Sequence, residues 1–255
     1  MSNLKADLLC IADSNWVLGH WYTNCMLNGR ELTDFTSMAG IAEDKLGHVR
    51  ALFRFMEEHF ELPEYQLEFG RSATQIHSME MLDTPPQNWA DFILTIFLAD
   101  AAIWRFTNAL RESDATPVTN LLTKFGEEAY FHQLCIDGWV KALDDQERGD
   151  LEAALQHRLP LALAWFDDDA DRSAFLETVS KKLSINTDTS VANKDSWDAL
   201  RRRTEGSEMP PRLWESIVPT SEEALIARRP LAVSVDDNID LFVKAKKDET
   251  EPQFG

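Results

Sequence analysis

Apolar residues in the first part of the chain repeat at steps of three and four, the period of an α-helix buried on one side. One stripe begins near Leu8 and stops before Asn28-Gly29, which predicts a helix over residues 4–27. A second stripe runs toward Pro63, and the helical conformation is disfavoured for a residue that precedes a proline. It predicts a long helix over residues 30–60.

The pattern then breaks for a long stretch and resumes. Residues 61–88 have no helical period and close on Thr84-Pro85-Pro86, which indicates a long connection. Further amphipathic stretches predict helices over residues 89–111, 117–143, 146–166 and 167–183. Long crossovers link the helix pairs of ferritin-like bundles. The expected fold is therefore all-α: a ferritin-like four-helix bundle with a long crossover and additional C-terminal helices.

Periodicity weakens toward the C-terminus. Residues 184–194 are rich in Ser, Thr, Asn and Asp, and residues 195–255 carry little pattern. The acidic run Asp248-Glu249-Thr250-Glu251-Pro252 is typical of disordered ends. We expect a helical domain over residues 1–194, followed by a C-terminal lobe with a partly disordered tail over residues 195–255.

The charge and the cysteine content argue against some classes of function. With 25 Lys and Arg against 44 Asp and Glu, the net charge is -19, so most of the surface would repel a nucleic acid. The N-terminus has no apolar run long enough for a signal peptide or a membrane span, which predicts no membrane role. The three cysteines, Cys10, Cys25 and Cys135, lack metal-type spacing and favour reduced thiols in the cytoplasm.

Polar residues stand where three of the predicted helices should continue their apolar stripes. Lys45 and His48 do so on the second helix, Asp100 on the third, and His132 on the fourth, with Glu128 one position to the side. An ionised group buried alone is costly. These side chains are therefore expected either to satisfy one another or to hold a metal.

A di-iron site is the first metal centre to test. Four-helix bundles build it from one carboxylate on each of two helices and a Glu-x-x-His pair on each of the others. Here the position three before His48 is Lys45, whose ammonium has no lone pair while charged. The position three before His132 is Ala129. Neither pair is complete.

Three runs of sequence resemble the phenylacetyl-CoA epoxidase family. They are Ala12-Asp13-Ser14-Asn15-Trp16-Val17-Leu18-Gly19, Asp44-Lys45-Leu46-Gly47-His48 and Glu128-Ala129-Tyr130-Phe131-His132-Gln133. That family comprises a catalytic di-iron subunit and a related non-catalytic structural subunit, which together oxygenate the ring of an aromatic CoA thioester. The resemblance implies a ferritin-like chain in aromatic catabolism.

The resemblance also indicates where the metal ligands would fall. The positions are Trp16 for the first-helix glutamate, Lys45 and His48 for the second-helix pair, Asp100 for the third-helix aspartate, and Ala129 and His132 for the fourth-helix pair. Three of the four carboxylates are missing, which implies the structural subunit, a chain without a cofactor of its own. Its implied partner is a di-iron catalytic homologue, in a homo- or hetero-oligomer.

We expect Lys45 to take the place of the metals. Its ammonium should pair with Asp100, while His48 and His132 complete the hydrogen bonding around that pair. The prediction concerns a degenerate di-iron site filled by an ion pair, and it can be checked by the distance between the Lys45 nitrogen and the Asp100 carboxylate.

A metal-dependent alternative stays open. Asp44 with His48, and Glu128 with His132, are pairs at i, i+4, a spacing that places two ligands on one helix face. Together with Asp100 they could hold iron in a divergent oxygenase of the ferritin-like superfamily. A third hypothesis is a stand-alone helical homo-oligomer that has kept the fold and lost the complex.

The run Arg201-Arg202-Arg203 stands out in so acidic a chain. A guanidinium run could contact phosphates or an acidic partner face. We instead expect it to be a solvated helix end.

Overall fold

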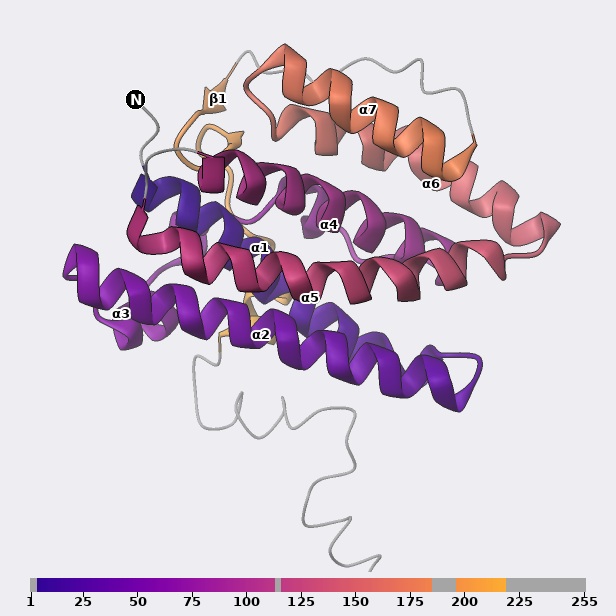
Figure 1. Cartoon of the computed structure of the whole chain (residues 1–255), viewed down its shortest axis with the longest axis horizontal. Helices are drawn as coiled ribbons and strands as arrows, with labels where there is room; N and C mark the ends of the chain where they lie inside the picture. The colour runs from indigo at the N-terminus through magenta and orange to yellow at the C-terminus, as the bar shows by residue number, and fades with distance from the viewer. Residues whose placement is uncertain (1–3, 113–115, 185–195, 219–255) are drawn as a thin grey trace, which may run out of the picture.

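Four long helices form the body of the protein (Figure 1). They are α1 (Leu4–Cys25), α2 (Leu32–Phe60), α4 (Trp89–Glu112) and α5 (Thr116–Lys141). The computed structural model describes residues 4–112, 116–184 and 196–218. Helix α1 packs along α2, and α4 packs along α5, so two helix pairs face each other. The ferritin-like, all-α fold expected from the periodicity is confirmed.

The crossover between the two pairs is irregular, as its sequence predicted. The short turn η1 (Met26–Asn28) joins α1 to α2, whereas the crossover contains α3 (Glu64–Phe69), η2 (Ala73–Gln75) and η3 (Glu80–Asp83). Helix α2 ends because Glu61 adopts the left-handed conformation, with a φ of 54°, and donates its N–H to the carbonyl of Met56.

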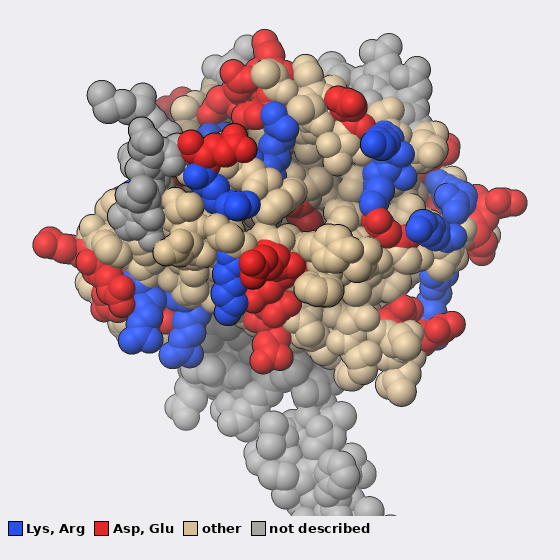
Figure 2. Space-filling view, in the orientation of Figure 1, with Lys and Arg blue, Asp and Glu red and all other residues tan. Residues whose placement is uncertain are grey.

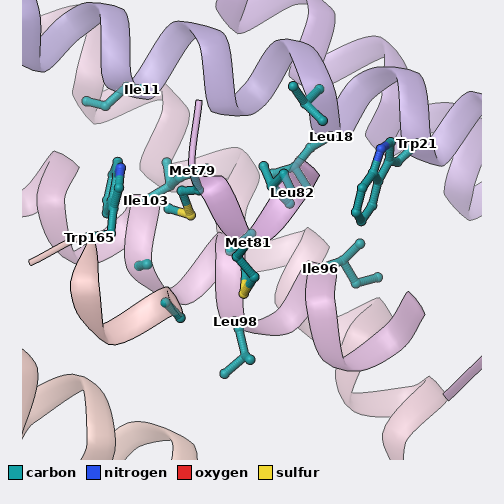
Figure 3. Close-up of a cluster of buried hydrophobic side chains, with 14 of the residues drawn as sticks. Ile11, Leu18, Trp21, Met79, Met81, Leu82, Ile96, Leu98, Ile103 and Trp165 are labelled. Carbon is teal, nitrogen blue, oxygen red and sulfur yellow. The ribbon is translucent and has the colours of Figure 1, made fainter. Parts of the chain in front are cut away.

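Parts of this crossover belong to the hydrophobic core. Met79, Met81 and Leu82 are fully buried and lie among side chains such as Leu18 and Ile96 (Figure 3). The crossover therefore connects the helix pairs and also fills the space between them, although its sequence has no regular apolar period.

Two further helices cover one side of α4. They are α6 (Asp145–Ala164) and α7 (Asp169–Leu183), and Figure 1 shows α7 as the outermost. Asp144 begins α6 through a capping box with Glu147, and the carboxylate of Asp168 accepts the first free N–H groups of α7. These are the additional C-terminal helices that the sequence predicted.

Within the described residues, α4 is the one helix long and apolar enough to cross a membrane. It lies at the centre of the fold, packed by α1, α5, α6 and α7, and most of it is buried in the protein. A helix that is apolar on nearly all sides is what a central core position requires. Its composition is therefore explained by packing within the bundle.

Residues 196–218 pack against the bundle. Strands β1 (Trp197–Asp198) and β2 (Arg203–Thr204) form a small antiparallel hairpin, too short to give an alternating pattern, and α8 (Pro211–Ile217) follows. The N–H of Met209 donates to the carbonyl of Ala73 in the crossover. The predicted boundary at residue 194 and the predicted disordered tail fall on residues 185–195 and 219–255, outside the described residues.

The expectation that the arginine run is a solvated helix end is wrong. Arg203 is fully buried and donates to the carbonyl of Ser78 at 2.8 Å and to the carboxylate of Asp83 at 2.6 Å. Arg202 lies over the ring of Phe106 at 4.2 Å. An irregular crossover leaves carbonyls that no helix satisfies, and the five donors of a guanidinium can bond several of them at once.

Candidate functional site

The predicted polar positions meet in the middle of the bundle. Lys45 and His48 come from α2, Asp100 from α4 and His132 from α5. Their exposed fractions are 3%, 5%, 9% and 3%, because each occupies a position of the apolar stripe that faces the core. With Asp44 and Glu128 they form what we call the central polar cluster.

Lys45 and Asp100 form an ion pair. The Lys45 Nζ lies 2.6 Å from the Asp100 Oδ1, and both side chains are at least nine-tenths buried. The distance is that of a charge-assisted hydrogen bond. The expected contact between the ammonium and the third-helix carboxylate is therefore present. The second oxygen, Asp100 Oδ2, has no hydrogen-bond partner within the described part of the chain.

The two histidines do not complete the hydrogen bonding around that pair, contrary to expectation. His48 Nε2 lies 2.5 Å from Glu128 Oε2, and His132 Nε2 lies 2.9 Å from Asp44 Oδ2. Both contacts cross between α2 and α5. Because these helices run antiparallel, each i, i+4 pair on one helix faces the reversed pair on the other. The carboxylates therefore bond the histidine of the opposite helix.

This exchange separates the donors that the metal-dependent alternative would bring together. The ring centroids of His48 and His132 are 6.4 Å apart, and each ring is engaged by one carboxylate. Among residues 4–112, 116–184 and 196–218, no three His, Cys, Asp or Glu side chains are placed to hold a metal ion. Asp100, the remaining predicted ligand, is bonded to Lys45.

The residues present do not fit a di-iron centre either. Trp16 packs edge-on against Phe53, with ring centroids 5.7 Å apart, and Ala129 has no ligand atom. The ammonium of Lys45 places a positive charge where two cations would sit. A cavity of only about 20 Å³ remains beside Lys45, Asp100 and Ala129, room for about one water molecule.

Burial sets the charge state of the histidines. Burial, and after it the neighbouring Lys45 ammonium, lower the pKa of His48 to about 2. Burial likewise lowers the pKa of His132, while burial and then Asp44 raise the pKa of Glu128. Both rings are therefore neutral near pH 7, and each gives its Nε2–H to a carboxylate.

A profile of the phenylacetic acid catabolic protein family matches residues 1–201. This span covers all four bundle helices and every member of the central polar cluster. The chain belongs to this family. No curated protein matches it. Membership in the phenylacetic acid catabolic protein family confirms the resemblance seen in the three sequence runs.

The sequence run from Ala12 to Gly19, one of the three that resemble the family, has a structural role in this phenylacetic acid catabolic protein. Asp13 is fully buried and accepts two hydrogen bonds from Arg71, at 2.7 and 2.8 Å, and one from the N–H of His77. Ser14 accepts from the N–H of Met79. These bonds fix the crossover onto α1. Sequence reasoning missed them because Arg71 lies in a segment without periodicity.

A second missed pair holds the other end of the crossover. Arg158 of α6 makes two hydrogen bonds to Asp91 of α4, each of 2.9 Å, and donates to the carbonyls of Met81 and Thr84. A signal was available here, because Arg158 interrupts the apolar stripe of α6 one position before the buried Leu159. It is the same kind of interruption that indicated Lys45.

The buried neutral His48 makes stability depend on pH. In the unfolded chain it titrates near 6.5, whereas in the folded protein its pKa is about 2. Below about pH 6.5 the unfolded state binds the extra proton, so stability falls as the pH falls. We expect His48 to contribute a loss of about 2 kcal/mol between about pH 7 and pH 5.

Urea denaturation at these two pH values measures the effect. In His48→Gln the loss of stability on acidification should be smaller than in the unsubstituted protein. His157→Gln is the matched control, because His157 is exposed on α6 and its replacement should leave the slope unchanged. Equal slopes for His48→Gln and the unsubstituted protein would show that His48 does not titrate as described.

Proposed function

We propose that this chain is a non-catalytic structural subunit of a phenylacetyl-CoA epoxidase-type complex, acting in aromatic catabolism. It binds a di-iron catalytic homologue in a hetero-oligomer and needs no cofactor of its own. The observation that supports the proposal is the Lys45–Asp100 ion pair, 2.6 Å long, at the centre of the bundle. By the correspondence that the family resemblance implies, a cation supplied by the chain itself takes the metal position of the catalytic homologue.

The charges of the central polar cluster support this reading. A di-iron centre needs several carboxylates to balance two metal ions. Here Asp100 is neutralised by Lys45, and Glu128 and Asp44 each bond a neutral histidine. Each of the three carboxylates of the cluster is thus bonded to a side chain of the bundle. The fold is kept while the oxygen-activating chemistry is left to another subunit.

The cellular setting fits the same proposal. Cys10, Cys25 and Cys135 are free thiols, and Cys10 is buried within α1. Thiols remain reduced in the cytoplasm. We therefore place the complex there.

Co-expression with a catalytic homologue tests the proposal. The partner to use is a family member that carries both complete Glu-x-x-His pairs. We expect the two chains to co-purify as one species with stable stoichiometry by light scattering, and the complex to oxygenate the CoA thioester. The chain purified alone should hold no stoichiometric iron.

Two results would contradict the proposal. Stoichiometric iron in the separate chain, lost in His132→Ala, would favour the metal-dependent oxygenase. Failure to bind the catalytic homologue, with a single homo-oligomeric mass in solution, would favour a stand-alone protein.

A further inference from the structure

Within residues 4–112, 116–184 and 196–218, no helix covers the side of the bundle that α2 and α5 form. In Figure 1 α2 and α5 lie side by side toward the viewer, whereas α6 and α7 cover α4 at the top. The register between α2 and α5 is fixed by the bond from His132 to Asp44 and by the bond from the Trp139 indole N–H to Asp34, 2.8 Å long. In the part of the chain that the structure describes, both helices have exposed residues along this seam.

The open side carries large apolar groups between small ones. Phe131 and Leu134 of α5 are 64% and 50% exposed, and Leu32 at the start of α2 is 79% exposed. Gly40 of α2 and Gly138 of α5 are exposed, and a side chain added at either would meet no atom within 4 Å. We call these residues, with Thr36, the α2/α5 face.

A groove runs along this face between the two helices. It has a volume of about 500 Å³. Its lining combines small and apolar residues with three charged ones: Thr33, Ser37, Leu134, Cys135, Gly138, Trp139 and Ala142, with Arg30, Glu31 and Asp34. Small residues on both walls let the backbone of another helix approach closely. Amphipathic helices bind in such grooves with their apolar side against exposed apolar residues.

The middle of the α2/α5 face carries no charged residue in a very acidic protein, although Arg30, Glu31 and Asp34 line part of the groove. No Asp, Glu, Lys or Arg occurs from Phe35 to Ala42 or from Ala129 to Ile136, although 27% of all residues are charged. In Figure 2 this appears as a broad tan area right of centre. Depletion of charge in a central apolar area marks the core of a protein interface.

The charges around the face indicate the kind of occupant. Glu31, Glu43 and Glu127 are exposed at its edges. The basic groups nearby are Lys124, 3.6 Å from Glu128, Arg30, 3.1 Å from Glu147, and Lys141, exposed at the end of α5. A second copy of this chain would bring another net charge of -19 and a second acidic edge against the first. A different chain with Lys or Arg beside an apolar helix would complement the edge.

We infer that the α2/α5 face is the docking surface for the partner chain, and that the partner presents an apolar helix flanked by basic residues. The inference rests on the proposed function, because it takes the catalytic homologue as that partner. It adds which side of this chain the homologue occupies. Phe131 and Leu134, on either side of His132 in the sequence of α5, are the anchors.

Binding measurements on the full chain with the purified catalytic homologue test this surface. The face variant is Phe131→Ser with Leu134→Ser, and the matched control is Tyr65→Ser with Leu200→Ser, two side chains that are 73% and 54% exposed on α3 and the hairpin. Truncation of two aromatic or aliphatic anchors should weaken the complex at least about 100-fold. The control should bind like the unsubstituted chain, and thermal melting should show both variants folded.

The possible outcomes distinguish an error in the docking surface from an error in the proposed function. Loss of binding in the face variant alone supports the α2/α5 face. Equal binding by both variants overturns the face while leaving the proposed function intact. If the unsubstituted chain does not bind the homologue, both fail, and a homodimer that the face variant disrupts would identify a second copy as the occupant.

Discussion

Replacing Lys45 by Met is expected to lower the free energy of unfolding by about 3–5 kcal/mol, the usual cost of breaking a buried ion pair on one side. The ammonium is bonded to Asp100 at 2.6 Å, and both side chains are at least nine-tenths buried. Without Lys45 the carboxylate keeps its desolvation cost and loses its partner. Urea denaturation followed by circular dichroism measures the change.

A double variant separates the ion pair from general packing damage. Lys45→Met with Asp100→Leu removes both charges and fills similar volume, so it should regain most of the stability lost in the single variant. If the single substitution changed stability by less than about 0.5 kcal/mol, the value typical of surface positions, Lys45 would not be a buried partner of Asp100.

Replacing Arg203 by Met should be similarly damaging, by about 3–5 kcal/mol. Arg203 is fully buried, and it bonds Asp83 and the carbonyl of Ser78, both in the crossover. Burial raises the pKa of Asp83 and Arg203 opposes that rise, so loss of the guanidinium leaves a costly carboxylate. We expect a lowered midpoint of thermal unfolding.

Arg212→Met supplies the comparison, because Arg212 is exposed on α8 and its loss should change stability by less than about 0.5 kcal/mol. If Arg203→Met were as mild as this control, residues 196–218 would not hold the crossover in the way the contacts indicate. A large difference would show that this C-terminal segment stabilises the bundle.

The helices and the central polar cluster were predictable for one reason. A helix has a fixed period, so a polar residue on the apolar stripe, such as Lys45, His48 or His132, must point into the core wherever the helix packs. The same reasoning applied to α6 would have found Arg158. The ion pair between Lys45 and Asp100 was expected because a buried ammonium requires a carboxylate, and the family resemblance placed both residues at metal-ligand positions.

The partners of the histidines could not be predicted in this way. Whether His48 bonds Asp44 on its own helix or Glu128 on α5 depends on the register and direction of two helices distant in sequence. Arg203 was misjudged for a related reason, since it lies outside any periodic segment and its burial depends on where the hairpin meets the crossover.

By itself the sequence therefore determined the helical elements, the bundle, and which polar residues enter its core, because these depend on local periodicity and on the cost of burying charge. Only the tertiary structure decided how those residues pair and which arginines hold the crossover. It also decided that Phe131 and Leu134 are exposed among the described residues, because contacts between segments far apart in the chain depend on packing direction and register.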